Sequence, residues 1–480
     1  MADQAYHAML HQKRLQNIVI SGESGSGKTE SAKLLLQQLV YLGRAPNRNL
    51  EAKILQVNPI MEAFGNAETG MNENSSRFGK YLDVTFTRAG KVTGAKIDVY
   101  LLEESRVHHQ ARGERNFHIF YYLLDGSANT DLQKELNLNK HGYNYLRGAL
   151  TDNADLKAVH KEMFQAVKNG FCLLGFRLEE INAIYRILSA ILHLGEIEFD
   201  EVKDEDSCHV HDPESLEMVA DLLGITAGDL GLALTTRSVV ASGESFVRRH
   251  TAEEAYTTRD SLARGLYNRL FRWVVNQVNA LLGVSRQAYG DPLSIGLLDI
   301  FGFETYKTNS LEQLRINITN EQLQFFFNQH VFTWEQQEYM AEGIEIDIIR
   351  FSDNRPILEL CLGKPLGILS LLDEESRFPR ATDWTFLEKL NSNFANNKLY
   401  VRSRSSADTT FSVRHYAGRV QYDVKGFLDK NRSYFSPDLV EILRGSSIDT
   451  IRYLYRCMVT KTGHLHVPSL VDGNKKARQI

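Results

Sequence analysis

A glycine-rich turn between a predicted strand and a predicted helix constrains this chain more than any other stretch. From Gly22 to Thr29 the sequence reads GESGSGKT and fits the pattern G-x-x-x-x-G-K-[ST]. Residues 16–21 before the turn predict a buried strand. Apolar residues recur at helical spacing after it, at Ala32, Leu35, Leu36, Leu39 and Val40, and Gly43 is a plausible end of that helix. The pattern and its context together predict a phosphate-binding loop.

Each residue type in this loop has a chemical reason to be there. Successive backbone N–H groups and a helix N-terminus face an anion in such a turn. Lys28 supplies a positive charge for the outer phosphates, and the hydroxyl of Thr29 is placed for Mg²⁺. A glycine turn without a ligand is the alternative, but the flanking strand and helix favour a nucleoside triphosphate site.

Composition excludes several classes of protein. The chain has 480 residues and a formal net charge of -5, which argues against nucleic acid as the main partner because phosphates require a basic surface. Its four cysteines have no paired spacing, which is typical of reduced thiols in an intracellular protein. No apolar run approaches the ~18 residues of a membrane span, and the N-terminus does not resemble a secretion signal. We therefore expect a soluble, cytoplasmic protein without a membrane span.

The order of predicted elements indicates an α/β fold. We expect a twisted, mixed sheet of the P-loop NTPase type with helices on both faces. Before residue 200 the predicted elements are a helix over 2–15, a helix that stops near 58 ahead of Pro59, a hairpin over 82–101 and mostly helix over 116–194. After it they are a surface loop over 200–213, helices ending at 223 and spanning 252–282, a buried strand over 293–298, a helix over 320–339 and short strands from 402. Cys208, His209 and His211 lie in the predicted loop, where a solvated loop is a better interpretation than a zinc site.

Two further stretches complete the chemistry of the phosphate loop. Residues 72–80 read NENSSRFGK, and residues 299–304 read DIFGFE directly after the strand over 293–298. Asp299 is the kind of acid that orients the water shell of a metal ion, and Gly302 allows a backbone N–H to approach the γ-phosphate. Arg77 and Glu304 have opposite charges that could pair and close the pocket against water.

These stretches, in this order, resemble the nucleotide site of myosin heads. Residues 22–31 look like the myosin phosphate loop, residues 72–80 like switch I and residues 299–304 like switch II. The resemblance covers roughly residues 1–455. It continues through the segments YLLE at 100–103, GERNFHIF at 113–120, NEQL at 320–323, FNQH at 327–330, PLGIL at 365–369, DEESRFP at 373–379 and HYAG at 415–418.

The resemblance implies a role for each site residue, with ATP and Mg²⁺ as ligands. Thr29 and Ser76 would bind Mg²⁺, with Asp299 behind them. The residues implied in catalysis are Lys28, Ser75 and Gly302, which would hold the γ-phosphate and the attacking water, and Arg77 and Glu304, which would form a gate that shuts for hydrolysis. The implied nucleotide contacts are Gly22, Glu23, Ser24, Gly25, Ser26, Gly27, Lys28, Thr29, Glu30, Asn72, Asn74 and Ser75.

The resemblance also implies an actin-activated motor. Residues 320–339 would be the relay helix that carries switch II movement to a lever, and their apolar face would also be ordinary core. The actin-facing segments would be residues 237–250, where Glu244 supplies a fixed charge, and residues 358–394. In the second segment Leu366, Ile368 and Leu369 could equally be core. We expect association with the actin cytoskeleton, and light chains or calmodulin only through a neck that is absent here.

The chain departs from the family pattern at both ends. Upstream strands, the converter and the neck of a complete head are not in the sequence, and residues 456–480 match no family segment. We therefore expect an incomplete motor domain over 1–455, whose strand at 16–21 has an open edge. The alternative function is a truncated, non-motor fragment that binds actin or a partner without efficient ATP turnover.

Overall fold

The computed structural model describes most of the chain, in two compact units. The described residues are 1–44, 49–139, 142–146, 153–202, 205–241, 244–283, 293–345, 350–378, 380–405, 407–432, 435–460 and 465–466. Unit 1 comprises Met1–Ile20, Gly27–Ile300 and Tyr434–Ile480. Unit 2 comprises Ser21–Ser26 and Phe301–Ser433.

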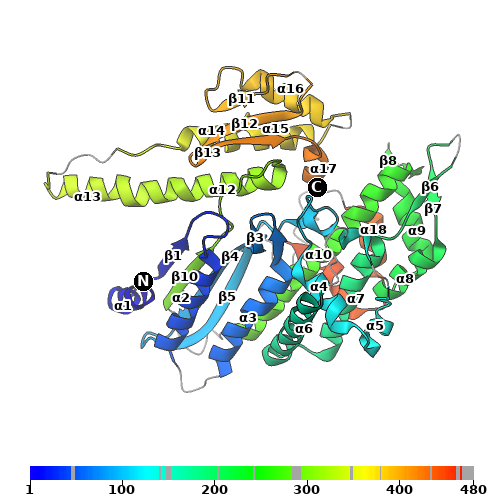
Figure 1. The fold of residues 1–480 in the computed structure, drawn as a ribbon, viewed down its shortest axis with the longest axis horizontal. Helices are drawn as coiled ribbons and strands as arrows, with labels where there is room; N and C mark the ends of the chain where they lie inside the picture. The colour runs from blue at the N-terminus through cyan, green and yellow to red at the C-terminus, as the bar shows by residue number, and fades with distance from the viewer. Residues whose placement is uncertain are drawn as a thin grey trace. The chain divides into compact units, whose positions relative to one another are not determined.

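Unit 1 is built on a four-stranded mixed sheet (Figure 1). Its strands lie in the order β1 (Gln16–Ile20), β10 (Leu293–Asp299), β4 (Gly79–Phe86) and β5 (Val92–Tyr100). β1 and β10 are parallel, and the other neighbours are antiparallel. Ile20 stands opposite Asp299, so the strand that precedes the phosphate loop and the strand that delivers Asp299 end at the same edge of the sheet. The predicted hairpin and mixed sheet are confirmed.

β1 lies at one edge of this sheet and is not buried, contrary to the prediction. Among the described strands it pairs only with β10. Its residues alternate between half-buried and exposed, and Val19 is 40% exposed. The apolar residues predicted a strand correctly, but a strand with one neighbour cannot bury both faces as a central strand does. The expected open edge is therefore present in the described residues.

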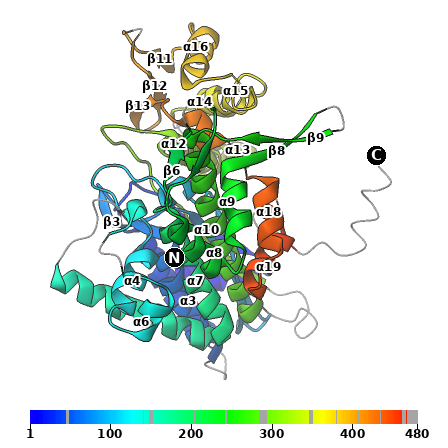
Figure 2. The ribbon, with the colours of Figure 1, turned by 90° about the vertical axis from the view of Figure 1, so that its right-hand side faces the viewer.

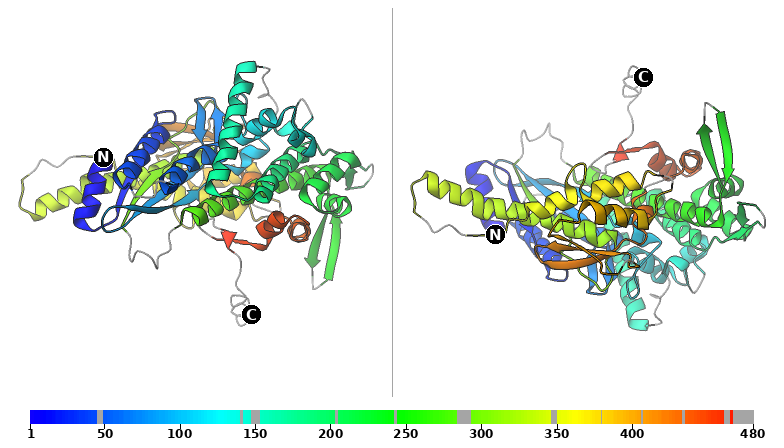
Figure 3. Two further views of the ribbon diagram at one scale, coloured as in Figure 1. Left: turned by 90° about the horizontal axis from the view of Figure 1, so that it is seen from below. Right: turned by 90° about the horizontal axis from the view of Figure 1, so that it is seen from above.

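Helices flank the sheet. Among the described helices, those that make the main contacts with its strands are α1 (Ala2–Gln12), α2 (Lys28–Leu42), α3 (Asn49–Gly65) and α10 (Ala252–Leu282). α1 ends at Gln12, before the predicted residue 15, because Lys13 takes a left-handed conformation with φ of 53°. Figure 3 shows α1 and α2 beside the strands. From α10, Asn279 exchanges two hydrogen bonds of 2.7 Å with the backbone of Ile97, which satisfies the outer edge of β5.

α3 runs through Pro59, which corrects the predicted stop near residue 58. Proline lacks a backbone N–H and usually ends or kinks a helix, at a cost of about 3 kcal/mol. The apolar face of α3 continues on both sides of the proline and is buried, with Val57, Ile60 and Phe64 at most 3% exposed. Tertiary burial therefore outweighs the lost hydrogen bond.

The remaining described elements of unit 1 are mostly helical. Before residue 200 they are β2 (Asn66–Thr69), β3 (Asn72–Ser76), η1 (Glu104–Val107), α4 (His118–Ser127), α5 (Asp131–Glu135), η2 (Asn144–Leu146), α6 (Ala154–Leu174), α7 (Leu178–Leu194) and the start of β6 (Phe199–Glu201). After it they are β7 (Cys208–Val210), α8 (Pro213–Leu223), α9 (Ala227–Thr235), β8 (Thr236–Ala241), β9 (Glu244–Arg249), α18 (Pro437–Arg444), α19 (Asp449–Arg456), β14 (Met458–Val459) and β15 (Leu465–His466). Residues 200–213 are thus not only a surface loop, since β6 and β7 pair there, and α9 is a helix that the sequence did not predict.

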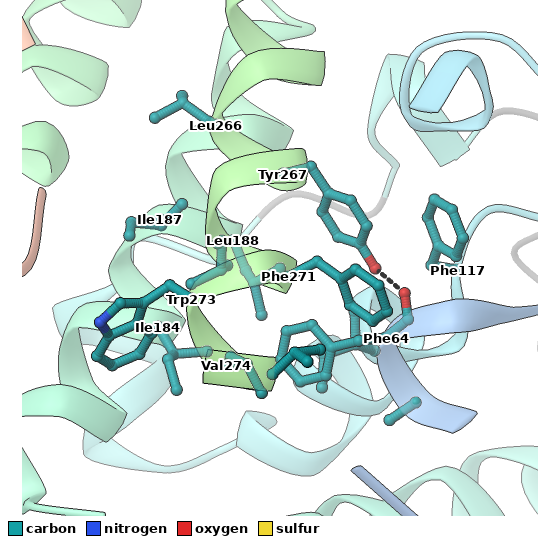
Figure 4. Close-up of a cluster of buried hydrophobic side chains, with 14 of the residues drawn as sticks. Phe64, Phe117, Ile184, Ile187, Leu188, Leu266, Tyr267, Phe271, Trp273 and Val274 are labelled. Atoms are coloured by element: carbon teal, nitrogen blue, oxygen red, sulfur yellow. Dashed lines mark hydrogen bonds between the residues drawn. The ribbon is translucent and has the colours of Figure 1, made fainter. Parts of the chain in front are cut away.

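The core of unit 1 gathers around α10 (Figure 4). Tyr267 on α10 stacks on Phe117, with ring centroids 4.7 Å apart. Its hydroxyl donates a 2.6 Å hydrogen bond to the carbonyl oxygen of Phe64 at the end of α3. α10 thereby fixes the positions of α3 and of the segments that follow it toward the predicted site.

Unit 2 contains the long predicted helix and a small antiparallel sheet. Its elements are α12 (Leu311–Asn328), the π-helical turn η3 (Gln329–Trp334), α13 (Glu335–Ala341), α14 (Arg355–Leu362), α15 (Ile368–Glu375), α16 (Asp383–Asn393), β11 (Tyr400–Arg402), β12 (Thr410–His415), β13 (Gly418–Asp423) and α17 (Phe427–Asn431). Leu311, Leu314 and Ile318 of α12 join the core of this unit.

The expectation that the apolar face of residues 320–339 is core is wrong in the described chain. Phe326 is 50% exposed and Trp334 is 49% exposed. The helical spacing of the apolar residues predicted a helix correctly. However, only the N-terminal half of α12 packs into the core of unit 2. The π-helical turn η3 interrupts the α-helical register within the predicted segment.

No single described helix is long and apolar enough to cross a bilayer. Only α8 and α9 pass that test as a pair, by length and composition, and they are bent by 112° relative to each other.

Candidate nucleotide site

The phosphate loop runs directly into a helix, as the sequence predicted. In the loop, Gly25 has a φ of 80° and Gly27 a φ of 84°, a region that favours glycine. α2 begins at Lys28 directly after Gly27, and Lys28 is buried. The first backbone N–H groups of a helix have no partner within it and suit an anion. α2 ends before Gly43 as predicted.

Two hydroxyls predicted as metal ligands come together in unit 1. The Oγ1 atom of Thr29 lies 3.3 Å from the Oγ atom of Ser76, at the end of β3. Asp299 is buried at the end of β10 and also forms a side-chain hydrogen bond with Thr29. Two hydroxyls beside one carboxylate are a hard-oxygen donor set that suits Mg²⁺. The residues present therefore fit this ion.

Asp299 lies in a setting that opposes its charge. Burial raises the pKa of its carboxyl, while the positive charge of Lys80, the hydrogen bond from Thr29 and the charge of Lys28 act in the opposite direction. The Lys80 Nζ atom is 3.9 Å from an Asp299 carboxylate oxygen. The net effect is a raised pKa, as expected for a carboxylate that lacks full compensation. A divalent cation would supply that compensation.

Residues 72–76 form a strand, β3. β3 pairs with β2, with Ser75 opposite Ala67 and Ser76 opposite Asn66. Asn66 Nδ2 donates to Asn74 Oδ1 over 3.0 Å. The hairpin therefore fixes the segment that carries Asn72, Asn74, Ser75 and Ser76 against the body of unit 1.

His118 also holds Asn74. Its Nε2 lies 3.1 Å from Asn74 Oδ1, which can only accept, so the ring nitrogen donates. Burial and the nearby charge of Arg115 lower the pKa of His118 to about 4. The imidazole is therefore neutral near pH 7.

Arg77 has a buried partner that sequence reasoning missed. Its Nε donates to Glu103 over 2.6 Å, and its Nη1 donates to the Ser75 hydroxyl over 3.0 Å. Glu103 also accepts from Arg106. The available signal was the spacing of two opposite charges, Glu103 and Arg106, directly after a predicted strand. The predicted pairing of Arg77 with Glu304 stays a prediction, because these residues belong to different units.

In unit 2, Gly302 lies against the backbone of the phosphate loop. A Cβ atom on Gly302 would meet the Gly22 carbonyl oxygen at 2.4 Å and Ser24 N at 2.5 Å. Phe303 forms a parallel β-bridge with Glu23 next to this contact. Glycine is therefore required at 302 by close packing of two backbones, a reason that differs from the predicted approach to the γ-phosphate.

Glu304 is fully buried and its backbone is clamped. The Glu304 N–H donates to Asn317 Oδ1 over 2.9 Å, and Asn317 Nδ2 donates to the Glu304 carbonyl over 2.7 Å. Asn317 lies on α12, so the segment predicted as switch II is attached to the helix that begins at Leu311.

The predicted actin-facing segments contain more regular structure than the sequence indicated. Residues 237–250 include most of a hairpin, β8 and β9, which extends away from α9 (Figure 2). The side chain of Glu244 lies outside the described residues. Residues 358–394 contain most of α14 and all of α15 and α16. In this segment Ile368 is core and Leu369 packs against it, whereas Leu366 is exposed.

No zinc-type cluster is found among the residues that the structure describes, where no group of three His, Cys, Asp or Glu side chains could hold a metal. His209 and His211 instead face Asp200, with His211 Nδ1 2.7 Å from its carboxylate. Cys208 is buried and forms no disulfide. Beyond residue 455, only 456–460 and 465–466 are described, so most of the unplaced segment 456–480 lies outside the described residues.

Comparison with known proteins shows which family this chain is similar to. Residues 1–478 match the family model described as "Myosin head (motor domain)". The chain is 49% identical over 474 residues to Myosin-IIIa from Homo sapiens, which corresponds to 97% of this chain and 29% of that protein. It is 46% identical over 473 residues to Myosin-IIIb from Mus musculus, covering 97% of this chain and 36% of that protein. A Myosin-I heavy chain from Dictyostelium discoideum is 44% identical over 462 residues, covering 95% of this chain and 19% of that protein.

Proposed function

Because the chain belongs to the myosin head (motor domain) family, we propose that it binds and hydrolyses Mg-ATP and couples hydrolysis to actin binding and lever movement in the complete protein. The observation that carries the proposal is the convergence of Thr29, Ser76 and Asp299, which come from three distant parts of the sequence. The chain spans about a third or less of the length of the relatives named above, so the activity of a whole protein is part of the proposal.

The described residues support a division of labour in hydrolysis. Lys28 and the N-terminus of α2 would bind the phosphates. Thr29 and Ser76, with Asp299 behind them, would hold Mg²⁺, which when bound neutralises charge that develops on the phosphate oxygens. Ser75 accepts a hydrogen bond from Arg77, so its own hydroxyl proton can be donated to orient a water molecule. By the resemblance alone, Gly302 and Glu304 of the switch II segment would also take part in hydrolysis.

The nucleotide contacts proposed from resemblance fall into two groups. Gly22, Glu23, Ser24, Gly25 and Ser26 belong to unit 2, and the contacts from Gly27 to Glu30 together with Asn72, Asn74 and Ser75 belong to unit 1. Glu30 pairs with Lys33 at 2.7 Å, and Lys33 also pairs with Glu62 at 2.8 Å. These ion pairs orient the exposed face of the first turn of α2.

Two described surfaces support actin as the partner. The β8–β9 hairpin exposes Phe246 and Val247 next to two arginines, Arg248 and Arg249. In residues 358–394, Leu366 and Phe378 are exposed. Apolar and charged groups exposed together are typical of protein interfaces. By the same resemblance we place the protein in the cytoplasm at the actin cytoskeleton, with light chains or calmodulin bound through a neck outside this chain.

The alternative is a fragment that binds actin or a partner without efficient turnover. Actin-stimulated phosphate release by the purified chain separates the two functions. Lys28→Ala should abolish both nucleotide binding and release, because its charge contacts the phosphates. Lys96→Ala is a matched control, since Lys96 is an exposed lysine on β5 that pairs with Asp98. Actin binding without nucleotide-dependent phosphate release in the parent chain would favour the alternative.

A further inference from the structure

Two buried arginines and two largely buried glutamates form a continuous chain of contacts that ends at Ser75. Glu114 accepts from Arg106 over 2.7 Å, and Arg106 Nε donates to Glu103 over 2.8 Å. Glu103 in turn accepts from Arg77 Nε over 2.6 Å, and Arg77 Nη1 donates to Ser75. All of these residues belong to unit 1. The chain of contacts therefore leads from the loop before α4 to the predicted switch I.

The network is balanced in charge and well shielded. Its two arginines and two glutamates sum to zero. The side chains of Arg77 and Arg106 are 0% and 2% exposed. Burial would raise the pKa of the Glu103 carboxyl, but the charges of Arg106 and Arg77 lower it to about 2. Glu103 is therefore an anion at any physiological pH, and its carboxylate pairs with both guanidinium groups.

The backbone holds the same partners in register. The Glu103 N–H donates to the Arg77 carbonyl oxygen over 2.9 Å, and Arg106 Nη1 donates to the Arg115 carbonyl oxygen over 2.9 Å. The carboxylate of Glu103 thus faces Arg77 from a fixed segment, and Arg106 fixes the other side of that carboxylate. Arg77 contacts Glu103 through its Nε atom and Ser75 through its Nη1 atom. Because the guanidinium group is rigid, these two contacts define its plane.

We propose that Glu103 and Arg106 are positioning residues for hydrolysis, which set the guanidinium of Arg77 and, through it, the hydroxyl of Ser75. This inference rests on the proposed function. Neither residue contacts substrate in this role. Glu103 acts through Arg77, and Arg106 acts through Glu103. A misplacement of about 1 Å in a catalytic constellation can reduce the rate about 100-fold, so the network is expected to affect the chemical step more than nucleotide affinity.

The test compares variants along the network. Glu103→Gln keeps the size of the side chain and removes its charge. Arg106→Met removes the far partner of Glu103 without changing any group that contacts Arg77 directly. Arg106→Lys restores the charge but not the planar fork. Asp260→Asn is the matched control, because Asp260 also pairs with an arginine, Arg259, at 2.7 Å on α10.

The readouts are kcat per nucleotide-binding site, the Kd for a fluorescent ATP analogue, and the unfolding temperature. We expect Glu103→Gln to lower kcat by about 10- to 100-fold, with Kd changed by less than about threefold. Arg106→Met should lower kcat less, and Arg106→Lys should recover part of that loss. Asp260→Asn should keep the parent kcat even where it lowers the unfolding temperature.

Two results would overturn this inference but not the proposed function. In the first, Glu103→Gln and Arg106→Met both keep the kcat of the parent. In the second, their kcat falls, but Asp260→Asn shows the same fall in kcat at the same loss of unfolding temperature. If Glu103→Gln does not fold, Arg106→Met and Arg106→Lys decide the question by the same criteria. A parent chain that binds no nucleotide, or binds without turnover, overturns the proposed function and the inference together. The two failures are therefore distinguished by the parent chain.

Discussion

The Thr29 Oγ1 atom and the Ser76 Oγ atom lie 3.3 Å apart, although 47 residues separate them in the sequence. Thr29 is in the first turn of α2, and Ser76 ends β3. The Thr29 hydroxyl also bonds to the Asp299 carboxylate. Two hydroxyls beside one carboxylate match what a hard divalent cation requires, which supports the role proposed for Mg²⁺.

We expect Thr29→Ala and Ser76→Ala each to weaken the Mg²⁺ dependence of nucleotide binding. Thr29→Ser should retain it, because serine supplies the same hydroxyl. Titration of Mg²⁺ at fixed nucleotide concentration measures the effect. The Mg²⁺ concentration at half saturation is expected to rise by about 10-fold or more, because one hard-oxygen ligand is lost.

Thr85→Ala is the control for this prediction. Thr85 and Thr93 form a similar hydroxyl pair, 3.2 Å apart, on the hairpin of β4 and β5. Its loss should leave the Mg²⁺ titration unchanged. An equal shift in Thr85→Ala and Thr29→Ala would show that the effect is general destabilisation and not the loss of a metal ligand.

The ionised carboxylate of Asp299 should lower the free energy of unfolding of the nucleotide-free chain. Burial raises its pKa above the ordinary value of about 3.9, so the protonated form is favoured in the folded state. The stabilisation from that proton is complete below about pH 4 and is lost as the pH rises through the raised pKa. At neutral pH the ionised carboxylate is therefore unfavourable without a cation.

We expect Asp299→Asn to raise the unfolding temperature without nucleotide at pH 7 and to abolish the additional stabilisation by Mg-nucleotide. The gain should shrink as the pH falls toward about 4, where the parent is protonated. Thermal unfolding across this pH range checks the sign. A lower unfolding temperature for Asp299→Asn at neutral pH, without ligand, would contradict it.

Local patterns predicted most of the elements that carry the candidate site, because the causes of these elements are local. The glycines before Lys28, the alternation in β4 and the apolar stripe of α2 each follow from neighbouring residues. Pro59 was misleading because burial of both halves of α3 outweighs its local cost. The exposed face with Phe326 was also misleading, since spacing predicts which residues share a face and not what covers it.

Partners that are distant in sequence could not be predicted by this reasoning. Glu103 reaches Arg77 only because the bulged β4–β5 hairpin returns the chain to the start of β4, with Tyr100 opposite Gly79. Likewise, the sequence predicted Gly302 as a site residue, but its contact with Gly22 depends on two loops that meet in unit 2. Such contacts are set by tertiary packing, which single-sequence patterns do not encode.

Gly302→Ala should impair turnover and stability together. The added Cβ would lie 2.4 Å from Gly22 O and 2.5 Å from Ser24 N, both backbone atoms that cannot rotate away. Overpacking of this kind typically costs about 1–3 kcal/mol. Displacement of the loop backbone should also lower nucleotide affinity, which equilibrium binding and thermal unfolding measure on the same samples.

Gly228→Ala is the matched control for this glycine. Gly228 lies in α9, and a Cβ there would have no atom within 4 Å. Gly228 is the second residue of α9, where alanine loses less conformational entropy than glycine on folding, so this variant should be neutral or more stable. If Gly302→Ala keeps the stability and nucleotide affinity that Gly228→Ala keeps, the close approach of the two backbones at Gly302 is not important for function.

Charge reversal tests the proposed gate between Arg77 and Glu304. Arg77→Glu should block hydrolysis, and adding Glu304→Arg should restore part of it by rebuilding the pair in reverse. Direct pairs usually couple by about 0.5–3 kcal/mol, so the rescue should appear as at least a several-fold increase in kcat over the single variant. Single-turnover hydrolysis on a complete head measures that step without product release.

Glu103 limits how complete this rescue can be. In Arg77→Glu the new carboxylate lies next to the buried carboxylate of Glu103, so two like charges share a site built for an ion pair. Adding Glu103→Gln to the reversed pair should therefore increase the rescue further, although the same change slows the parent. A reversed pair as inactive as the worse single variant, with or without Glu103→Gln, would show that Arg77 and Glu304 do not form the gate. A rescue that needs Glu103→Gln would show instead that Arg77 balances two carboxylates, one on each side of its guanidinium group.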